Sequence, residues 1–379
     1  MKKKMSLAVL ILMSAAALLP LACGKNLAPS ASGPVTVVQV LPTSTSTSTN
    51  LPGTSTPTST PTGTPTPNAF GGFVWGAATT NAAFPGRQSP TGLVYNNAMW
   101  LIGGYNPTNN YLNDVWSSTN GASWTNVLPD LTGGSSTQFI GRTNHTSLVF
   151  NNAMWVIGGD NGLLGGVLND VWSSTNGSTW TQTASASSAN IFPARGDHTS
   201  LVFNNTMWVI GGFGASSPYF LNDVWASTDG ASWYEATPGA AFSARQGHAS
   251  VVFNNAMWVI GGQSNSSYLN DVWTSTNGVS WTQVLANTAS PGATQFSQRN
   301  YFASFVYNNA IWVIGGYAAG TLVDDAWYST NGSTWTEATA TAAFSKRDAL
   351  FGLVYNNAMW VVSGANTSTY LNDAWYSPY

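Results

Sequence analysis

The sequence predicts an all-β fold, a six-bladed β-propeller of four-stranded blades that is closed by an N-terminal strand completing the last blade. One observation is a repeat: the pattern Asn-Asn-x-hydrophobic-Trp occurs six times at intervals of 48 to 55 residues. That interval is the period of propeller blades. A second observation is that each copy contains four short β-runs separated by turn residues. The Trp of the pattern stands at Trp100, Trp155, Trp208, Trp258, Trp312 and Trp360.

The other tryptophans follow the same repeat. A second Trp ends an Asn-Asp-Val-Trp element or a variant of it, at Trp116, Trp172, Trp225, Trp273, Trp327 and Trp375. A third lies in a Ser-Trp-Thr element or a variant, at Trp75, Trp124, Trp180, Trp233, Trp281 and Trp335. Three positions in six copies account for all 18 Trp residues.

The second copy shows how the four strands follow one another. Strands are predicted over Thr146–Phe150, Ala153–Ile157, Asp170–Ser174 and Thr179–Thr183. Asn151-Asn152 and Asn176-Gly177 are predicted as tight turns, because Asn tolerates the positive φ that such turns need. Gly158-Gly159 ends the second strand, and its missing side chains let a bulky neighbour approach. That strand is apolar on both faces, so blades must cover it on both sides.

The repeats are out of register with the chain ends. The last copy stops at Tyr379, after its third strand, and an unpartnered fourth-strand element, Gly72-Phe73-Val74-Trp75, precedes the first copy. Trp75 to Phe84 and Trp335 to Phe344 have the same nine-residue spacing. Residues near 71 to 78 are therefore expected to complete the sixth blade and close the ring, which removes exposed sheet edges.

Three segments are predicted: a signal peptide over 1–22, a lipidated Cys with a Thr/Ser/Pro-rich tether over 23–67, and the propeller over 68–379. The leader has a charged start, Lys2 to Lys4, an apolar run and small residues before Cys23. It resembles a bacterial lipoprotein leader, which implies lipidation of Cys23, although Pro20 stands where such leaders usually carry Leu. An uncleaved anchor over Met5 to Ala22 is the alternative.

The lipoprotein resemblance also implies a cellular location. Gly24 follows the Cys where inner-membrane lipoproteins often have Asp, so the resemblance favours a bacterial outer membrane or the cell surface, with the lipid as the only membrane contact. The Thr/Ser/Pro segment cannot form a core and is expected to act as a flexible tether spanning on the order of 35 Å. Cys23 is the single Cys of the chain, so disulfide and cysteine chemistry are not expected inside the fold.

The low content of charged residues and the negative net charge limit the classes of partner that the protein can bind. Charged residues make up only 7% of the chain, where a soluble domain carries roughly a quarter. With the three leader lysines removed, 11 − 3 = 8 cations face 14 anions, a net charge of −6. This balance argues against binding a phosphate backbone, so nucleic acid is not an expected partner.

The repeat residues resemble those of the kelch family in the galactose oxidase/kelch-like superfamily of β-propellers. The resemblance rests on an Arg-x-x-His element such as Arg195-Gly196-Asp197-His198, a hydrophobic run ending in a Gly pair, and the following aromatic and Trp. It covers about residues 70 to 379 and implies the propeller fold, whereas kelch propellers serve both as enzymes and as binding modules. The copper-radical site of some relatives needs a Cys crosslinked to Tyr, so no such site and no cofactor are expected here.

Two charged series recur once per blade and are expected to form structural ion pairs within each blade. They are Arg87, Arg142, Arg195, Arg245, Arg299 and Arg347, and Asp114, Asp170, Asp223, Asp271, Asp325 and Asp373. An arginine crown for an acidic ligand is the functional alternative. His145, His198 and His248 occupy one repeat position in three consecutive blades, but equivalent positions in a ring lie too far apart for a shared zinc ion, so a structural role and no metal are expected.

The residues that break the repeat are the candidates for ligand binding. They follow each Gly pair or lie just past each Arg: Tyr105, Asn144, Asp160, Asp197, Phe213, Gln263, Asn300, Tyr301, Tyr317 and Asp348. They are expected to ring the mouth of the central channel, where aromatic faces beside amides suit sugars or polar peptide segments. The alternative is that they are ordinary solvated loop residues.

The expected function is a monomeric, surface-tethered binding module that recognises a glycan or a protein through its variable loops. The alternative is a carbohydrate-active enzyme such as a sugar mutarotase or a glycosidase, with Asp160, Asp197 or Asp348 as acid or base. Glu235 and Glu337 lie on the outermost strand and are poorly placed for catalysis. No catalytic constellation has to be invoked for binding, so the non-enzymatic function is preferred.

Overall fold

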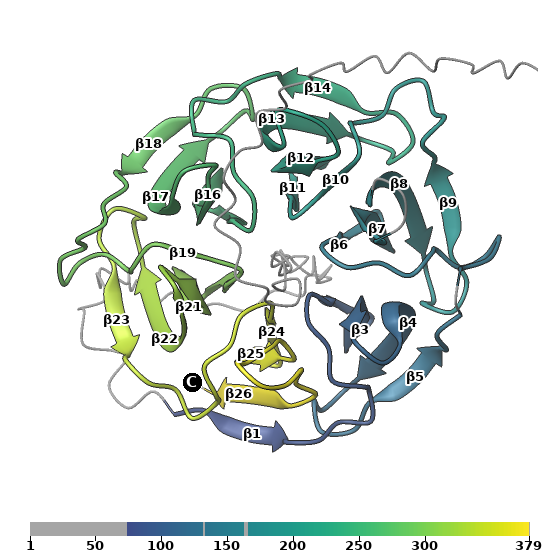
Figure 1. The fold of residues 1–379 in the computed structure, drawn as a ribbon, viewed down its shortest axis with the longest axis horizontal. Coiled ribbons are helices and arrows are strands. Elements are labelled where there is room, and N and C mark those ends of the chain that lie inside the picture. Colours follow the sequence, from purple (N-terminus) through teal and green to yellow (C-terminus); the bar gives the residue numbers. More distant parts are fainter. Residues whose placement is uncertain (1–73, 132, 163–165, 379) are drawn as a thin grey trace, which may run out of the picture. The chain divides into compact units, whose positions relative to one another are not determined.

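The computed structural model describes residues 74–378 except 132 and 163–165. Within these residues every regular element is a β-strand, and the strands form six antiparallel sheets arranged around a common centre (Figure 1). The described part therefore contains no helix that could span a membrane. The fold is the predicted six-bladed propeller, whereas the predicted signal peptide and tether lie outside the described residues.

Each sheet is one blade, listed here from the inner strand outward. Blade 1 contains β2 (Thr91–Tyr95), β3 (Ala98–Asn106), β4 (Asn110–Ser118) and β5 (Thr125–Leu128). Blade 2 contains β6 (Thr146–Phe150), β7 (Ala153–Asp160), β8 (Val167–Ser174) and β9 (Thr181–Ala184). Blade 3 contains β11 (Thr199–Phe203), β12 (Thr206–Gly214), β13 (Phe220–Ser227) and β14 (Tyr234–Thr237), with the short β10 (Arg195–Gly196) also paired to β12.

The other three blades repeat this order. Blade 4 contains β15 (Ala249–Phe253), β16 (Ala256–Gln263), β17 (Tyr268–Ser275) and β18 (Thr282–Leu285). Blade 5 contains β20 (Ala303–Tyr307), β21 (Ala310–Ala318), β22 (Thr321–Ser329) and β23 (Thr336–Thr339), with the short β19 (Arg299–Asn300) paired to β21. Blade 6 contains β24 (Phe351–Tyr355), β25 (Ala358–Val362), β26 (Ala374–Pro378) and β1 (Gly76–Thr79).

The turns and strand ends refine the predicted boundaries of blade 2. The Asn151-Asn152 turn has φ values of 46° and 56° at its two residues, as predicted. In the second turn only Gly177 has a positive φ, of 75°, so the reason given for Asn176 was wrong. The Asn176 side-chain oxygen instead accepts hydrogen bonds from the backbone N–H groups of Ser178 and Thr179, both 3.0 Å long. Strands β7 and β8 continue past the predicted ends, because a bulge at the Gly pair keeps them paired.

The hydrophobic core lies between the blades. Each of six clusters of buried side chains joins residues from two consecutive blades. The inner strand of every blade also contacts the inner strands of both neighbours, which closes the ring. Trp100 shows the fit: a Cβ added at Gly177 in the next blade would lie 2.2 Å from its indole ring. Both faces of each blade are therefore buried by its neighbours.

A buried ion pair joins the segment before the inner strand to the third strand, or to the residue just before it, in every blade. In blade 3 the Arg195 guanidinium donates to both carboxylate oxygens of Asp223 at 2.7 Å and to the Gly211 carbonyl at 3.0 Å. The guanidinium carbon lies 5.8 Å from the ring centre of Phe192, three residues earlier in the chain. The same Phe-x-x-Arg arrangement and the same Arg–Asp pair occur in all six blades.

The sixth blade is assembled from both ends of the described chain. Strand β1 pairs with β26 as the outermost strand, beside β25 and β24 (Figure 1). Trp75 is 4% exposed and meets Phe344 edge to face with 5.1 Å between ring centres, as Trp180 meets Phe139 in blade 2. The Ser377 hydroxyl also donates to the Val74 carbonyl at 2.9 Å.

We expect Trp75→Ala to lower the free energy of unfolding by about 3 to 5 kcal/mol. Removing this large buried aromatic side chain would leave a cavity next to Phe344, in the connection before β24. Val74→Ala is the matched control, since Val74 is 69% exposed and its truncation removes little buried area. Chemical denaturation of both variants measures the difference. Equal stability of the two variants would show that the N-terminal strand does not hold the ring closed.

Candidate functional site

The two faces of the ring differ in their connections. Strands alternate in direction along each blade. The turns between the first and second strands therefore lie on the same face of the ring as the turns between the third and fourth strands. The connections between second and third strands, and those between blades, lie on the opposite face, which we call the loop face. All candidate ligand-binding residues belong to connections or strand ends on the loop face.

A belt of backbone hydrogen bonds encircles the axis beneath the loop face. Its six members lie two residues after the repeated Arg of each blade, and five have non-Gly side chains in the left-handed region: Ser89, Asn144, Asp197, Tyr301 and Ala349, with Gly247 as the sixth. Five N–H to carbonyl bonds of 2.9–3.1 Å run from Ser89 through Ala349, Tyr301, Gly247 and Asp197 to Asn144. Neighbouring members are thus about 5 Å apart, which makes a narrow ring.

The belt brings predicted residues together, and it buries them. Asn144, Asp197, Asn300, Tyr301 and Asp348 are all buried, so they do not form the open mouth that the sequence predicted. The Tyr301 ring lies over Gly247, where an added Cβ would come within 2.6 Å of it. Its hydroxyl oxygen is 3.2 Å from the Gln246 side-chain nitrogen. Tyr301 therefore fills space beside the axis that a side chain at Gly247 would take.

The half-buried candidates form an outer circle above the belt. Tyr105, Asp160, Phe213, Gln263 and Tyr317 are partly exposed, and each is paired through its backbone with a residue that follows the Arg of its own blade. A hydrogen bond between neighbouring blades also links the buried residues beside the belt to the outer circle: the Asn300 side-chain amide donates to the Gln263 side-chain oxygen at 3.0 Å.

Five aromatic residues of this circle were missed by the sequence analysis. Tyr105 contacts Tyr111 and Tyr370, with 5.4 and 6.1 Å between ring centres. Phe213 contacts Tyr219 and Phe220, and Tyr268 contacts Tyr317 in the next blade. We call these eight residues the aromatic collar. A signal for four of the missed residues exists in the sequence: an aromatic residue directly precedes the Leu-Asn motif of the third strand in four copies, at Tyr111, Phe220, Tyr268 and Tyr370.

Three carboxyls of the loop face, those of Asp160, Asp197 and Asp348, form no salt bridge among the described side chains. Burial, and then the charge of Asp160, raises the pKa of Asp197 well above its usual range. Burial also raises the pKa of Asp348 to about 7. The pKa of the Tyr301 phenol is raised well above its usual value by burial and then by the charges of Asp197 and Asp348. The acids and the phenol therefore share one neighbourhood.

The repeated arginines do not form a crown that is open to a ligand. Each of the six guanidinium-bearing side chains is fully buried and is bonded to the Asp of its own blade at 2.6–2.8 Å. Their hydrogen bonds to carboxylate and carbonyl oxygens leave no face for an acidic ligand. The functional alternative for this series is therefore wrong.

The three histidines join neighbouring blades. The Nε2 atoms of His145, His198 and His248 lie 2.9, 3.1 and 3.1 Å from the hydroxyls of Thr91, Thr146 and Thr199, each in the preceding blade. Burial, and then the nearby Arg195, lowers the pKa of His198 to about 3, so this imidazole is neutral. In the described range no group of three or more His, Cys, Asp or Glu residues is placed to hold a metal ion.

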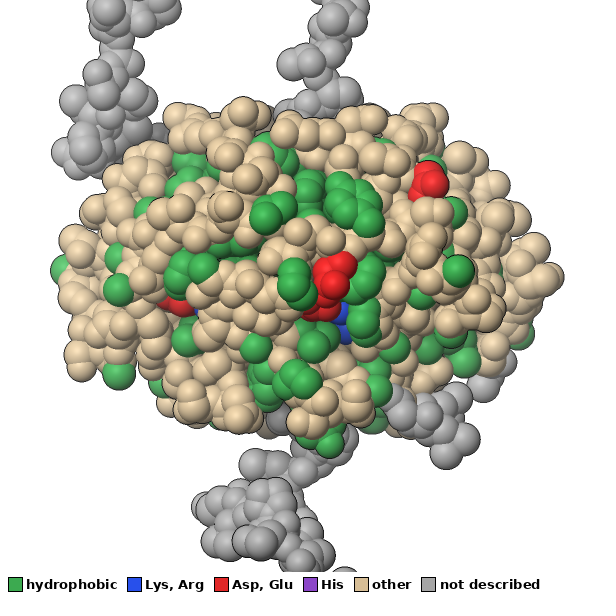
Figure 2. Space-filling view, turned by 90° about the horizontal axis from the view of Figure 1, so that it is seen from above, with side chains coloured by type: hydrophobic (Ala, Val, Ile, Leu, Met, Phe, Trp, Pro, Cys, Tyr) green, Lys and Arg blue, Asp and Glu red, His purple; other side chains and the backbone are tan. Residues whose placement is uncertain are grey.

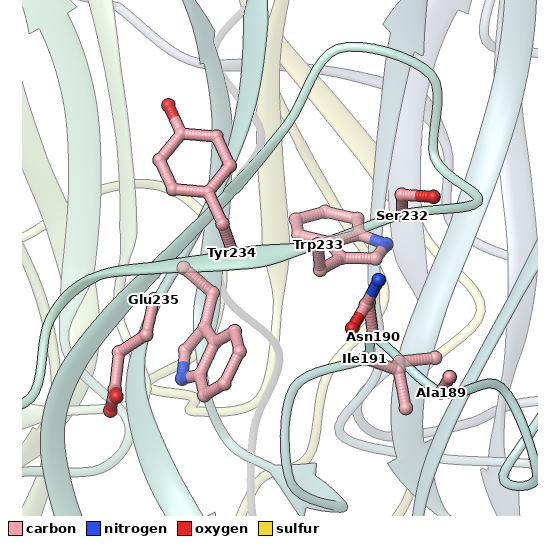
Figure 3. A pocket seen from close by; sticks show the side chains of 8 residues that line it. Ala189, Asn190, Ile191, Ser232, Trp233, Tyr234 and Glu235 are labelled. Atoms are coloured by element: carbon pink, nitrogen blue, oxygen red, sulfur yellow. The ribbon is translucent and has the colours of Figure 1, made fainter.

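An open groove of about 460 Å³ lies on the outer rim of blade 3 (Figure 3). It is lined by Asn190 and its neighbours in the preceding connection and by Ser232, Trp233, Tyr234 and Glu235. A similar groove on the rim of blade 6 lies beside Val74 and Trp75. Because the groove recurs where an outer strand packs on the preceding connection, it belongs to the repeat architecture, and none of its lining residues belongs to the collar.

The rest of the surface carries little charge. Among the described residues, the exposed charged side chains are Asp130, Asp229, Glu235, Glu337 and Lys346. The side of the ring seen in Figure 2 accordingly shows only a few charged side chains among polar and apolar atoms. A surface with so few charges produces only a weak long-range electrostatic field.

A family model described as the KLHDC2/KLHL20/DRC7 Kelch-repeats domain matches residues 74–238 and 227–377. Among curated proteins no sequence matches significantly.

We expect the buried Asp348 to contribute a loss of stability as the pH rises from about 4 to 7, because its carboxyl holds a proton in the folded state that the unfolded chain has already lost. The buried His145, His198 and His248, whose pKa values burial lowers, contribute in the opposite direction, so the contribution of Asp348 is measured as a difference between variants. The slope from this carboxyl is up to about 1.4 kcal/mol per pH unit. Asp348→Asn should remove that contribution, so its free energy of unfolding relative to the unaltered protein should rise from pH 5 to 7, as measured by urea denaturation of both proteins at pH 5, 6 and 7. Asp229→Asn is the control: Asp229 is exposed and its pKa is lowered, first by a hydrogen bond from the Ser232 backbone. A slope unchanged by Asp348→Asn would contradict this burial.

Proposed function

Since the chain belongs to the kelch-repeat family, we propose that it is a binding module that recognises a partner protein through the aromatic collar of its loop face. The single observation that carries the proposal is the collar itself. It places eight aromatic side chains from five of the six blades around one axis, on a scaffold that is otherwise almost uncharged. Rigid aromatic side chains are the residues that dominate binding energy at protein interfaces.

The scaffold favours binding over catalysis. Six of the collar residues lie in paired strands, and the Tyr219 carbonyl accepts a hydrogen bond of 2.8 Å from the Gly214 N–H, so a ligand loses little free energy to ordering this surface. Tyr219 is 51% exposed and stacks on Phe213 at 5.5 Å between ring centres, which holds its ring in place. Polar groups next to the collar, including Gln263 and Asp160, supply hydrogen-bonding partners for a polar peptide segment.

We further propose that the module is displayed from a membrane. The leader residues and the Thr/Ser/Pro-rich segment up to residue 67 support lipidation at Cys23 and a flexible tether. A tether would let the loop face meet partners at varying distances from the lipid surface. An outer membrane or cell-surface position is part of this proposal.

Tyr219→Ala should weaken the binding of a partner protein at least tenfold, which corresponds to about 1.4 kcal/mol. The partner is first captured by a photo-crosslinking phenylalanine analogue at position 219, and its affinity is then measured by calorimetry. Tyr234→Ala is the matched control, because Tyr234 is 55% exposed but lies on the outer strand β14. Equal losses in the two variants, or a collar that retains only glycans on an array, would overturn the proposal of a protein-binding collar.

Cys23→Ser should move the protein from the detergent phase to the aqueous phase in a Triton X-114 partition, and it should abolish labelling by an alkyne-bearing fatty acid. Both changes follow from the loss of the thiol that carries the lipid. Ser is close in size to Cys, so the leader keeps its apolar character. Retention in the detergent phase without labelling would identify the leader as an uncleaved anchor instead.

A further inference from the structure

We infer that the axial site beneath the collar binds a primary ammonium group, and that the cognate ligand is a lysine side chain of the partner protein. This inference rests on the proposed function, because it names the chemistry that the loop face recognises. The site consists of the belt residue Asp197, the flanking Asp348, and the side-chain oxygens of Gln88 and Asn300.

Unsatisfied hydrogen-bond acceptors are the first argument. Asp197 Oδ1, Asn300 Oδ1 and Gln88 Oε1 are buried atoms without a hydrogen-bond partner in the protein. Their residues are only 6%, 2% and 6% exposed. They come from the start of blades 3, 5 and 1, one or two residues after the repeated Arg of each blade. A buried acceptor without a donor costs free energy, so each of these atoms favours a ligand that donates.

The narrow belt is the second argument. Its backbone bonds hold Asp197 and Tyr301 on either side of Gly247. In a six-membered ring with neighbours about 5 Å apart, opposite members are only about 10 Å apart. Side chains from opposite blades can therefore reach one ligand group between them. An ammonium group has three donors and no acceptor, which matches the three unpartnered acceptors Asp197 Oδ1, Asn300 Oδ1 and Gln88 Oε1.

The missing countercharge is the third argument. Asp160, Asp197 and Asp348 lie around the loop face, and none of them appears in an ion pair among the described residues. All six arginines are bound elsewhere, and Lys346, the remaining cation of the described range, is exposed. A cation would let Asp197 and Asp348 ionise, whereas now burial opposes their charge and raises the pKa of both carboxyls.

The collar suits the rest of a lysine side chain. The methylene stem can pack on tyrosine and phenylalanine faces while its charged end reaches the acceptors. An ammonium group passing the rings is also attracted by their π-electrons. A guanidinium is broader and planar, so the narrow belt favours the compact ammonium.

The test compares two peptides on the unaltered protein, Ac-Gly-Lys-Gly-NH₂ and the same peptide with an Nε-acetylated lysine, by NMR titration at pH 6 and 8. We expect the lysine peptide to bind at least tenfold more tightly than the acetylated one at pH 8. Its affinity should rise from pH 6 to 8, with proton release on binding, because the cation displaces a proton from Asp348. Equal affinities for the two peptides would overturn the inference.

Variants locate the site. Asp197→Asn and Asp348→Asn should each weaken binding of the lysine peptide at least tenfold, while Glu235→Gln, an exposed acid on the outer strand, should leave it unchanged. If Asp197→Asn fails to fold in a thermal melt, Asp348→Asn and the peptide pair on the unaltered protein decide the question. Tight binding of Ca²⁺ alone, or of a neutral hexose in place of the lysine peptide, would also overturn the inference.

The two proposals can fail separately. If Tyr219→Ala weakens the captured partner but the two peptides bind equally, the collar binds protein and the ammonium site is wrong. If the lysine peptide is preferred but Tyr219→Ala does not affect the partner, the partner binds elsewhere and the proposed function of the collar is wrong.

Discussion

The burial of both faces of every blade is the constraint on which the rest of this structure depends. A strand such as β7 is apolar on both sides, so its sheet is stable only when another sheet covers each side. Six such sheets satisfy one another when they close into a ring, and the six core clusters lie between consecutive blades. Closure places the inner strands around one axis, and the loops of all blades consequently converge on one face.

The acidic side chains of the described residues fall into two groups: those in the Arg–Asp pairs within the blades, and those that form no salt bridge. Each Arg is buried against the Asp of its own blade and the Phe three residues before it, so removing either ionic partner would leave a buried charge unpaired. These pairs join the segment before each inner strand to the third strand, or to the residue just before it, and leave the exterior nearly neutral. Asp160, Asp197 and Asp348 stand outside this system, and they lie where the blades meet. The chemistry of the loop face therefore comes from residues that depart from the repeat.

Prediction from the sequence was correct where a residue's role is local or is repeated. Asn151-Asn152 forms its turn because two residues with positive φ are needed there, and the Trp period counts the blades. It was less successful around the axis. Asn144, Asp197 and Tyr301 were expected at an open mouth, but the belt bonds turn them inward and bury them. Tyr219 was missed because its importance comes from stacking on Phe213 across a connection.

By itself, the sequence determined the class of fold, the number of blades, the turn residues and the Arg and Asp series, because each follows from a periodic pattern or from backbone chemistry within a few residues. Only the tertiary structure decided which irregular residues are buried, which aromatics meet in the collar and which acceptors lack donors. Those properties arise between blades that are up to several hundred residues apart in the chain. Their side chains approach one another only after the ring has closed, so no local pattern encodes their contacts.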